Sequence, residues 1–205
     1  MPLARISHPK CSANFLVNLP HSADILCTEC GFRIAVNDMA APQVLTYLPC
    51  PFVSQARSAR TIVIKPTEGS FSSYKCGDDL HVGISDPSSA VYSFSARGLL
   101  RETSGWDAVL VLYRFKMDSF PKLLAMYINS RGDQFTKNVY RESSLNCFDF
   151  ITQFFSFAKL GRFTKEEFAN QYVVRALQSA LRYSALVEKV KADGPLACPH
   201  DFSGA

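Results

Sequence analysis

The sequence predicts an α+β fold, in which a short antiparallel sheet packs against two or three helices. Segments typical of strands occupy residues 61–115, where β-branched and aromatic residues fall between turn residues. Apolar residues at helical spacing dominate after residue 118. Because the strands come first and the helices afterwards, the pattern favours α+β over an alternating α/β fold.

Composition sets the broad class of the protein. The chain has 205 residues, 47% hydrophobic and 20% charged, which suits one folded domain with a small appendage. Its net charge of +4 is too small and dispersed to predict nucleic-acid binding. The start lacks the apolar core of a signal peptide, and no apolar run approaches the length of a membrane span. We therefore expect no membrane partner and a cytoplasmic or nuclear protein that is not secreted.

Three regions are expected. Residues 1–58 form a cysteine-rich N-terminal segment with four of the seven cysteines and six prolines, which favours short strands joined by turns. Residues 59–192 form the α+β core. Residues 193–205 form a flexible C-terminal tail.

Within the core, strands are predicted at 61–66, 80–84, 91–95 and 108–115. The second and third flank a turn with Asp86-Pro87 and form a hairpin, and a loop at 98–105 precedes the fourth. One helix begins at Asp118 or Ser119 and ends near residue 128, and a second covers 144–160. Thr164 and Glu167 fit a capping box that opens a third helix, ending near residue 191.

The N-terminal segment contains a candidate zinc site. Cys27 and Cys30 form a CxxC knuckle, a spacing that lets two sulfurs hold one tetrahedral zinc ion. Cys11 is the best third ligand. The fourth is His8, His21 or Cys50, and we favour His8 because it lies near Cys11. The alternative is a set of ordinary reduced cysteines in a small hairpin; a redox site is disfavoured because no thioredoxin-like pattern surrounds it.

Cys147 and His81 are the candidates for thiol chemistry. Asn146 can cap the second helix, which places Cys147 in its first turn, where the helix dipole stabilises a thiolate. His81 lies mid-strand and points away from Leu80 and Val82. The alternative is structural: Cys147 begins an apolar helix face, and His81 is a satisfied histidine.

A histidine on a strand followed later by a cysteine at a helix start resembles the circularly permuted papain-like thiol enzymes. LHVGISDPSSAVYSF is similar to the histidine hairpin of the PPPDE-type peptidases and the lecithin:retinol acyltransferase group, and SSLNCFDFITQFF to their cysteine helix. The resemblance implies that His81 activates Cys147 to attack a carbonyl. Ser93, on the neighbouring strand, is the available third member, with Tyr92 and Ser95 beside it. A hydroxyl there departs from the usual His, Asn, Gln or Asp.

Blocks along most of the chain, from CTECGF through IVIKPTEGSF, DLHVGI and LNCFDF to FTKEEFANQYVV, resemble the makorin opposite-strand protein family. That resemblance implies a small intracellular protein and no particular activity. Two functional hypotheses remain. One is a thiol hydrolase or acyl-transfer enzyme, weak or lapsed, with an acyl or peptide substrate. The other is a non-catalytic protein-interaction module with a structural zinc knuckle.

Overall fold

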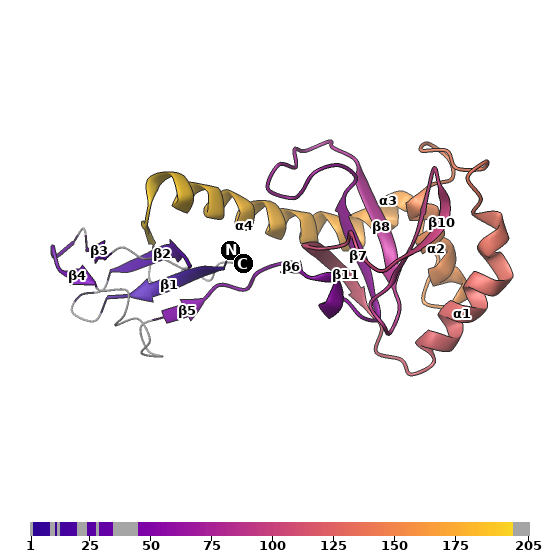
Figure 1. Cartoon of the computed structure of the whole chain (residues 1–205), viewed down its shortest axis with the longest axis horizontal. Coiled ribbons are helices and arrows are strands. Elements are labelled where there is room, and N and C mark those ends of the chain that lie inside the picture. Colours follow the sequence, from indigo (N-terminus) through magenta and orange to yellow (C-terminus); the bar gives the residue numbers. More distant parts are fainter. Residues whose placement is uncertain are drawn as a thin grey trace. The chain divides into compact units, whose positions relative to one another are not determined.

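The structure is a computed structural model that describes residues 2–8, 11, 13–19, 24–27, 29–34 and 45–198. His21 lies outside these residues. The chain divides into two compact units, one made of Met1–Cys50 with Leu181–Ala205 and the other of Pro51–Ala180 (Figure 1). The division falls eight residues before the predicted boundary at 58–59, because β6 (Phe52–Val53) already pairs with β11 (Val109–Arg114).

The larger unit, Pro51–Ala180, contains a six-stranded antiparallel sheet. Its order is β10-β9-β8-β7-β11-β6. The bounds not yet given are β7 (Thr61–Pro66), β8 (Leu80–Ser85), β9 (Val91–Ser95) and β10 (Gly98–Glu102). The expected loop at 98–105 was wrong, since its first five residues form β10. Gly98 adopts a φ of +94°, which closes a tight hairpin between β9 and β10 that the sequence pattern did not signal.

The helices follow the sheet, which confirms the α+β class. They are α1 (Phe120–Arg131), α2 (Cys147–Phe157), α3 (Lys165–Phe168) and α4 (Val174–Asp193). Asn146 caps α2 with a full capping box, and Thr164 caps α3 in the same way. A π-helical turn at Ala169–Val173 separates α3 from α4, so the predicted third helix is interrupted.

The two faces of the larger sheet carry different cores. One face packs against α1 and α2 through a cluster of phenylalanines that includes Phe94, Phe120, Phe150 and Phe154 (Figure 1). The other face buries Trp106 against Val63, Val91 and Val109. His81 belongs to the Trp106 face, since its ring centroid lies 5.4 Å from that of Trp106. Trp106 is fully buried and therefore acts as a core residue.

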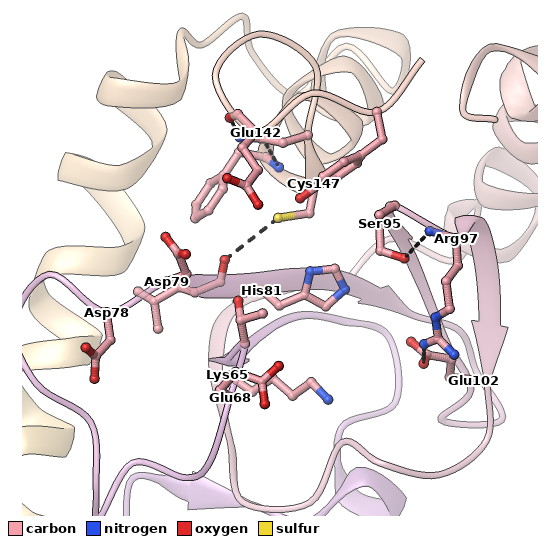
Figure 2. A pocket seen from close by; sticks show the side chains of 16 residues that line it. Lys65, Glu68, Asp78, Asp79, His81, Ser95, Arg97, Glu102, Glu142 and Cys147 are labelled. Carbon is pink, nitrogen blue, oxygen red and sulfur yellow. Dashed lines mark hydrogen bonds and ion pairs between the residues drawn. The ribbon is translucent and has the colours of Figure 1, made fainter. Parts of the chain in front are cut away.

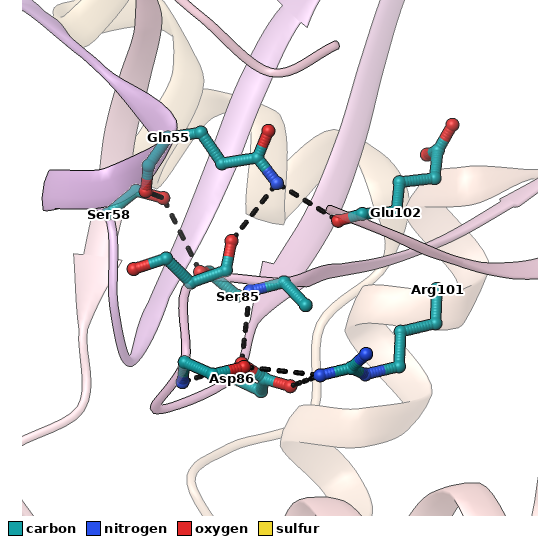
Figure 3. Close-up of polar contacts among 9 residues, drawn as sticks. Gln55, Ser58, Ser85, Asp86, Arg101 and Glu102 are labelled. Atoms are coloured by element: carbon teal, nitrogen blue, oxygen red, sulfur yellow. Dashed lines mark hydrogen bonds and ion pairs between the residues drawn. The ribbon is translucent and has the colours of Figure 1, made fainter. Parts of the chain in front are cut away.

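A partly buried polar network fixes the turn between β8 and β9 (Figure 3). The Asp86 carboxylate accepts hydrogen bonds from the backbone of Ser88 and Ala90, and Arg101 donates to its other oxygen at 2.9 Å. Gln55 donates to the carbonyls of Ser89 and Glu102. These bonds hold the hairpin against β10.

The smaller unit contains a four-stranded antiparallel sheet with the order β12-β2-β1-β5. Its strands are β1 (Leu3–Ser7), β2 (Asn14–Asn18), β5 (Leu45–Tyr47) and β12 (Leu196–Cys198). A separate hairpin pairs β3 (Ile25–Leu26) with β4 (Arg33–Ile34). Part of the tail expected to be flexible, 193–205, thus forms a strand paired with β2. Within the described ranges, no helix combines the length and apolar character that a membrane crossing needs.

Candidate functional site

Four side chains that the sequence proposes as metal ligands gather in the smaller unit. The ligand atoms of His8, Cys11, Cys27 and Cys30 all lie within 4.8 Å of one another. His8 directly follows β1, and Cys27 directly follows β3. Gly31 has a φ of +68°, and its N–H donates to the Cys27 carbonyl, which turns the chain tightly between Cys30 and β4. The cluster therefore joins a His-x-x-Cys pair to the Cys-x-x-Cys knuckle.

The separations suit a tetrahedral ion. The Cys11 and Cys27 sulfurs are 3.6 Å apart, and Cys30 Sγ lies 3.7 Å from His8 Nδ1. Ligands of tetrahedral zinc, with Zn–S of about 2.3 Å and Zn–N of about 2.0 Å, are separated by about 3.5–3.8 Å. His8 Nδ1 and Cys11 Sγ, at 2.8 Å, are closer than this. Cys50 is an exposed cysteine outside the cluster. The four residues can thus bind a metal.

The thiols of the cluster influence one another's ionisation. The Ala13 backbone N–H favours the Cys11 thiolate, but burial and the neighbouring Cys27 and Cys30 thiols together raise the pKa of Cys11 to about 11. For Cys27, burial opposes ionisation, but the backbone N–H groups of Cys30 and Glu29 and the side chains of Cys11 and Cys30 lower the pKa. A bound cation would replace the protons that these thiols share.

A second site lies in the larger unit, at the end of the sheet where β8 begins. A pocket of about 600 Å³ is lined by both His81 and Cys147. Figure 2 shows both side chains at this pocket, with the Cys147 sulfur directed at strand β8. No hydrogen bond joins the two side chains among the described residues. The fold therefore brings the predicted pair to one cavity without pairing them.

The Cys147 side chain forms a hydrogen bond with the backbone at the start of β8. The ladder between β8 and β9 ends at the pair Gly83–Ser93, and the Cys147 thiol donates to the Leu80 carbonyl at 3.8 Å just beyond that pair. Burial raises the pKa of Cys147, although the backbone N–H groups of Val82 and Phe148 act in the opposite direction. The thiol is thus protonated at neutral pH.

His81 is neutral at the same pH. Burial lowers its pKa to about 4, and the nearby charge of Lys65 adds to this effect. An imidazole this weakly basic is a poor acceptor for a thiol proton.

Ser93, the predicted third member, is fully buried. Its hydroxyl donates to the Glu102 carboxylate at 2.9 Å. Glu102 also accepts from the Trp106 indole and pairs with Arg97. Ser93 therefore belongs to a polar cluster around Glu102, and the structure gives it no hydrogen bond to His81.

The pocket also contains acidic residues that the sequence reasoning missed: Glu68, Asp78, Asp79 and Glu142 (Figure 2). Glu68, Asp78 and Asp79 come from the β7–β8 connection, and Glu142 comes from the segment before α2, at least 63 positions later in the chain. No local motif links them, so only the fold could reveal them.

Comparison with known proteins identifies the family of this chain. A sequence profile described as "DUF4796 C-terminal" matches residues 45–190, well over half of the sequence. The chain belongs to the DUF4796 C-terminal family. It is also 24% identical, over 155 residues, to the human MKRN2 opposite strand protein, which covers 70% of this chain and 69% of the relative. The resemblance to the makorin opposite-strand family is thereby confirmed.

No solved structure matches the chain. The resemblance to papain-like enzymes therefore stays a prediction. The DUF4796 C-terminal match contains the whole pocket of His81 and Cys147, whereas the four clustered metal-ligand candidates precede it. The pocket is thus part of the shared domain, and the family match says nothing about the metal cluster.

Proposed function

We propose that this chain is a non-catalytic binding protein whose N-terminal unit is stabilised by one zinc ion. The observation that carries the zinc assignment is the convergence of His8, Cys11, Cys27 and Cys30 within 4.8 Å. Three thiolates and one imidazole form a soft tetrahedral donor set, which favours zinc over magnesium or calcium. With no free coordination position left, the zinc would be structural.

The N-terminal unit has reason to need a metal. The apolar cluster of this unit is small and is built mainly from short strands and turns. Its buried side chains include Ile6, Phe15, Ile25 and Ile34. The β3–β4 hairpin has two residues in each strand, too few to be stable alone. A zinc ion would join this hairpin to β1, and its binding energy would become folding energy.

Metal analysis tests the zinc assignment. Full-length protein purified without chelator should contain about one equivalent of zinc, and Cys27→Ser should contain far less. Cys76→Ser is the matched control, because Cys76 is an exposed cysteine outside the cluster. Equal metal content in Cys27→Ser and Cys76→Ser would refute the proposal.

The proposal that the protein is non-catalytic rests on the electrostatics of the pocket. A protonated thiol that donates to a backbone carbonyl, beside a histidine with a pKa of about 4, is not an activated nucleophile. In this proposal the pocket of the larger unit binds a ligand and does not transform it. Cys147 has a structural role in this pocket, because its thiol donates a hydrogen bond to the Leu80 carbonyl at the start of β8.

A thiol hydrolase or acyl-transfer enzyme is the second candidate, because His81 and Cys147 line one cavity. In that case the thiol would attack the carbonyl of an ester, the thiol proton would pass to His81, and the leaving alcohol would take it up. Incubation with p-nitrophenyl acetate followed by intact-mass analysis would detect the resulting thioester. An acetyl group on Cys147 that is absent in both Cys147→Ser and His81→Gln would establish the enzyme; unmodified Cys147 would support the binding protein.

A further inference from the structure

We propose that the pocket of His81 and Cys147 binds an organic polycation, a ligand with several ammonium groups on alkyl stems. A polyamine and a lysine-rich peptide segment share this chemistry. The proposal rests on the binding function argued above and names its ligand class. It is carried by the cavity, by the balance of charges around it and by its aromatic wall.

The cavity itself points to a ligand. Its volume of about 600 Å³ falls within the range of small-molecule sites, about 300–1,000 Å³. Tyr140 and Phe148 form an aromatic part of the lining, and Cys147 lies beside them. Such a wall can pack alkyl stems and attract ammonium groups through cation–π contacts.

The charges around the cavity are unbalanced. Five carboxylates line it, against the two cations Lys65 and Arg97: Glu68, Asp78, Asp79, Glu102 and Glu142. The formal charge is therefore −3, on a chain whose net charge is +4. His81 adds no positive charge at neutral pH. A concave site of one sign focuses its field and attracts ligands of the opposite sign.

The two cations are already engaged. Arg97 pairs with Glu102 at 3.3 Å. The Lys65 ammonium donates to the Gly105 carbonyl at 2.7 Å and lies 4.8 Å from the Trp106 ring centroid. Neither neutralises the carboxylates of Glu68, Asp79 and Glu142, for which the described part of the chain provides no hydrogen bond or ion pair. These three charges remain for a ligand.

The carboxylates of Asp79 and Glu142 both act on the Tyr140 side chain. Burial raises the pKa of Tyr140, and the negative charges of Glu142 and Asp79 add to the shift. Asp79 immediately precedes β8, whereas Glu142 lies shortly before α2, so the fold directs charges from distant segments to the same ring. That ring lines the pocket.

A single metal ion does not fit this arrangement. Within the described residues, the one group of three or more possible ligands close enough for an ion is the cluster of His8 and the three cysteines. The pocket carboxylates are therefore spread around the cavity. Spread charges match a ligand whose positive groups are separated by alkyl stems.

Calorimetric titration of the full-length protein at pH 7 and 50 mM NaCl would test the proposal with two probes, spermine and acetyl-tetralysine amide. The test variant is Asp79→Asn/Glu142→Gln. The matched control is Asp133→Asn/Glu166→Gln, which removes the same two charges from exposed positions outside the pocket. We expect the pocket variant to lose about tenfold or more in affinity, because two of the carboxylates available to the ammonium groups of the ligand lose their charge. The control should keep the affinity.

Either probe can support the proposal. Tighter binding of spermine would indicate a polyamine, and tighter binding of the peptide would indicate lysine side chains. The inference is overturned if neither probe binds below about 1 mM, or if both double variants bind equally. Zinc content measured on the same samples distinguishes the two proposals. Protein that contains zinc but does not bind either polycation refutes only the polycation proposal. Protein that binds a polycation but contains no zinc refutes only the zinc assignment.

Discussion

The Cys147 thiol donates its hydrogen bond to the Leu80 carbonyl, although its sulfur lines the same pocket as the His81 imidazole. Leu80 begins β8, beyond the point where the β8–β9 ladder ends. The thiol therefore donates to the Leu80 carbonyl, which lies outside the paired part of β8 and β9. This contact explains why a cysteine at the start of a helix need not be a nucleophile.

Alkylation rates follow from this contact. Cys147 is 4% exposed and its pKa is raised by burial, whereas Cys76 is exposed. Since the thiolate is the reactive form, iodoacetamide at pH 7 should modify Cys147 more slowly than Cys76. Peptide mass spectrometry over time would measure both rates. The interpretation fails if Cys147 reacts faster and slows in His81→Gln.

His81 should make stability depend on pH. Its folded pKa is about 4, below the ordinary 6.5, so between these values the unfolded chain binds a proton that the folded chain does not. The free energy of unfolding should therefore fall as the pH falls from 6.5 toward 4. After allowance for partial exposure, the wild type should lose about 1 kcal/mol more than His81→Gln between pH 7 and pH 5. Urea unfolding at both pH values measures this; parallel losses would show that the pKa of His81 is not lowered.

Asp86 should stabilise the β8–β9 turn. Burial opposes its charge, but hydrogen bonds from Ser88, Arg101 and Ala90 outweigh burial and lower its pKa. Asp86→Ala leaves these donors unpaired and should reduce the free energy of unfolding by about 2–3 kcal/mol. Asp86→Asn, which keeps an accepting oxygen, should lose less. The stabilisation should be present above the ordinary pKa of 3.8 and disappear as the pH falls below it. An Ala variant as stable as wild type would contradict this role.

Gly83 is required by close packing between β8 and β9. A Cβ there would lie 2.5 Å from a Val91 methyl carbon and 3.1 Å from the Trp106 ring. Gly83→Ala should therefore destabilise the domain by about 1–3 kcal/mol. Gly132→Ala is the control, because Gly132 has a helical φ of −54° and its nearest neighbour would be at 3.5 Å. Thermal unfolding of both variants should separate them, and equal melting temperatures would exclude overpacking at Gly83.

Local signals in the sequence account for part of this structure. The capping boxes at Asn146 and Thr164 mark the starts of α2 and α3, because the cap residues form bonds within one turn of chain. The His-x-x-Cys and Cys-x-x-Cys spacings likewise suggest a metal cluster, since each pair lies within one short turn.

Long-range relationships were not predictable in the same way. Strand β10 depends on pairing with β9, and the π-helical turn contains Tyr172, whose ring packs against that of Phe168. Ser93 was proposed from its position on the strand beside His81, but the buried Glu102 carboxylate takes its hydrogen bond. The pocket carboxylates come from separate segments, so no spacing in the sequence indicates that they share a cavity.

X-ray absorption at the zinc edge tests the central claim most directly, because it reports the atoms around the metal itself. Full-length protein expressed with zinc and purified without chelator should show three sulfur neighbours at about 2.3 Å and one nitrogen at about 2.0 Å. Replacement of Cys30 by serine should remove one sulfur or the metal. Protein without zinc, or a coordination shell of oxygen and nitrogen alone, would contradict the account.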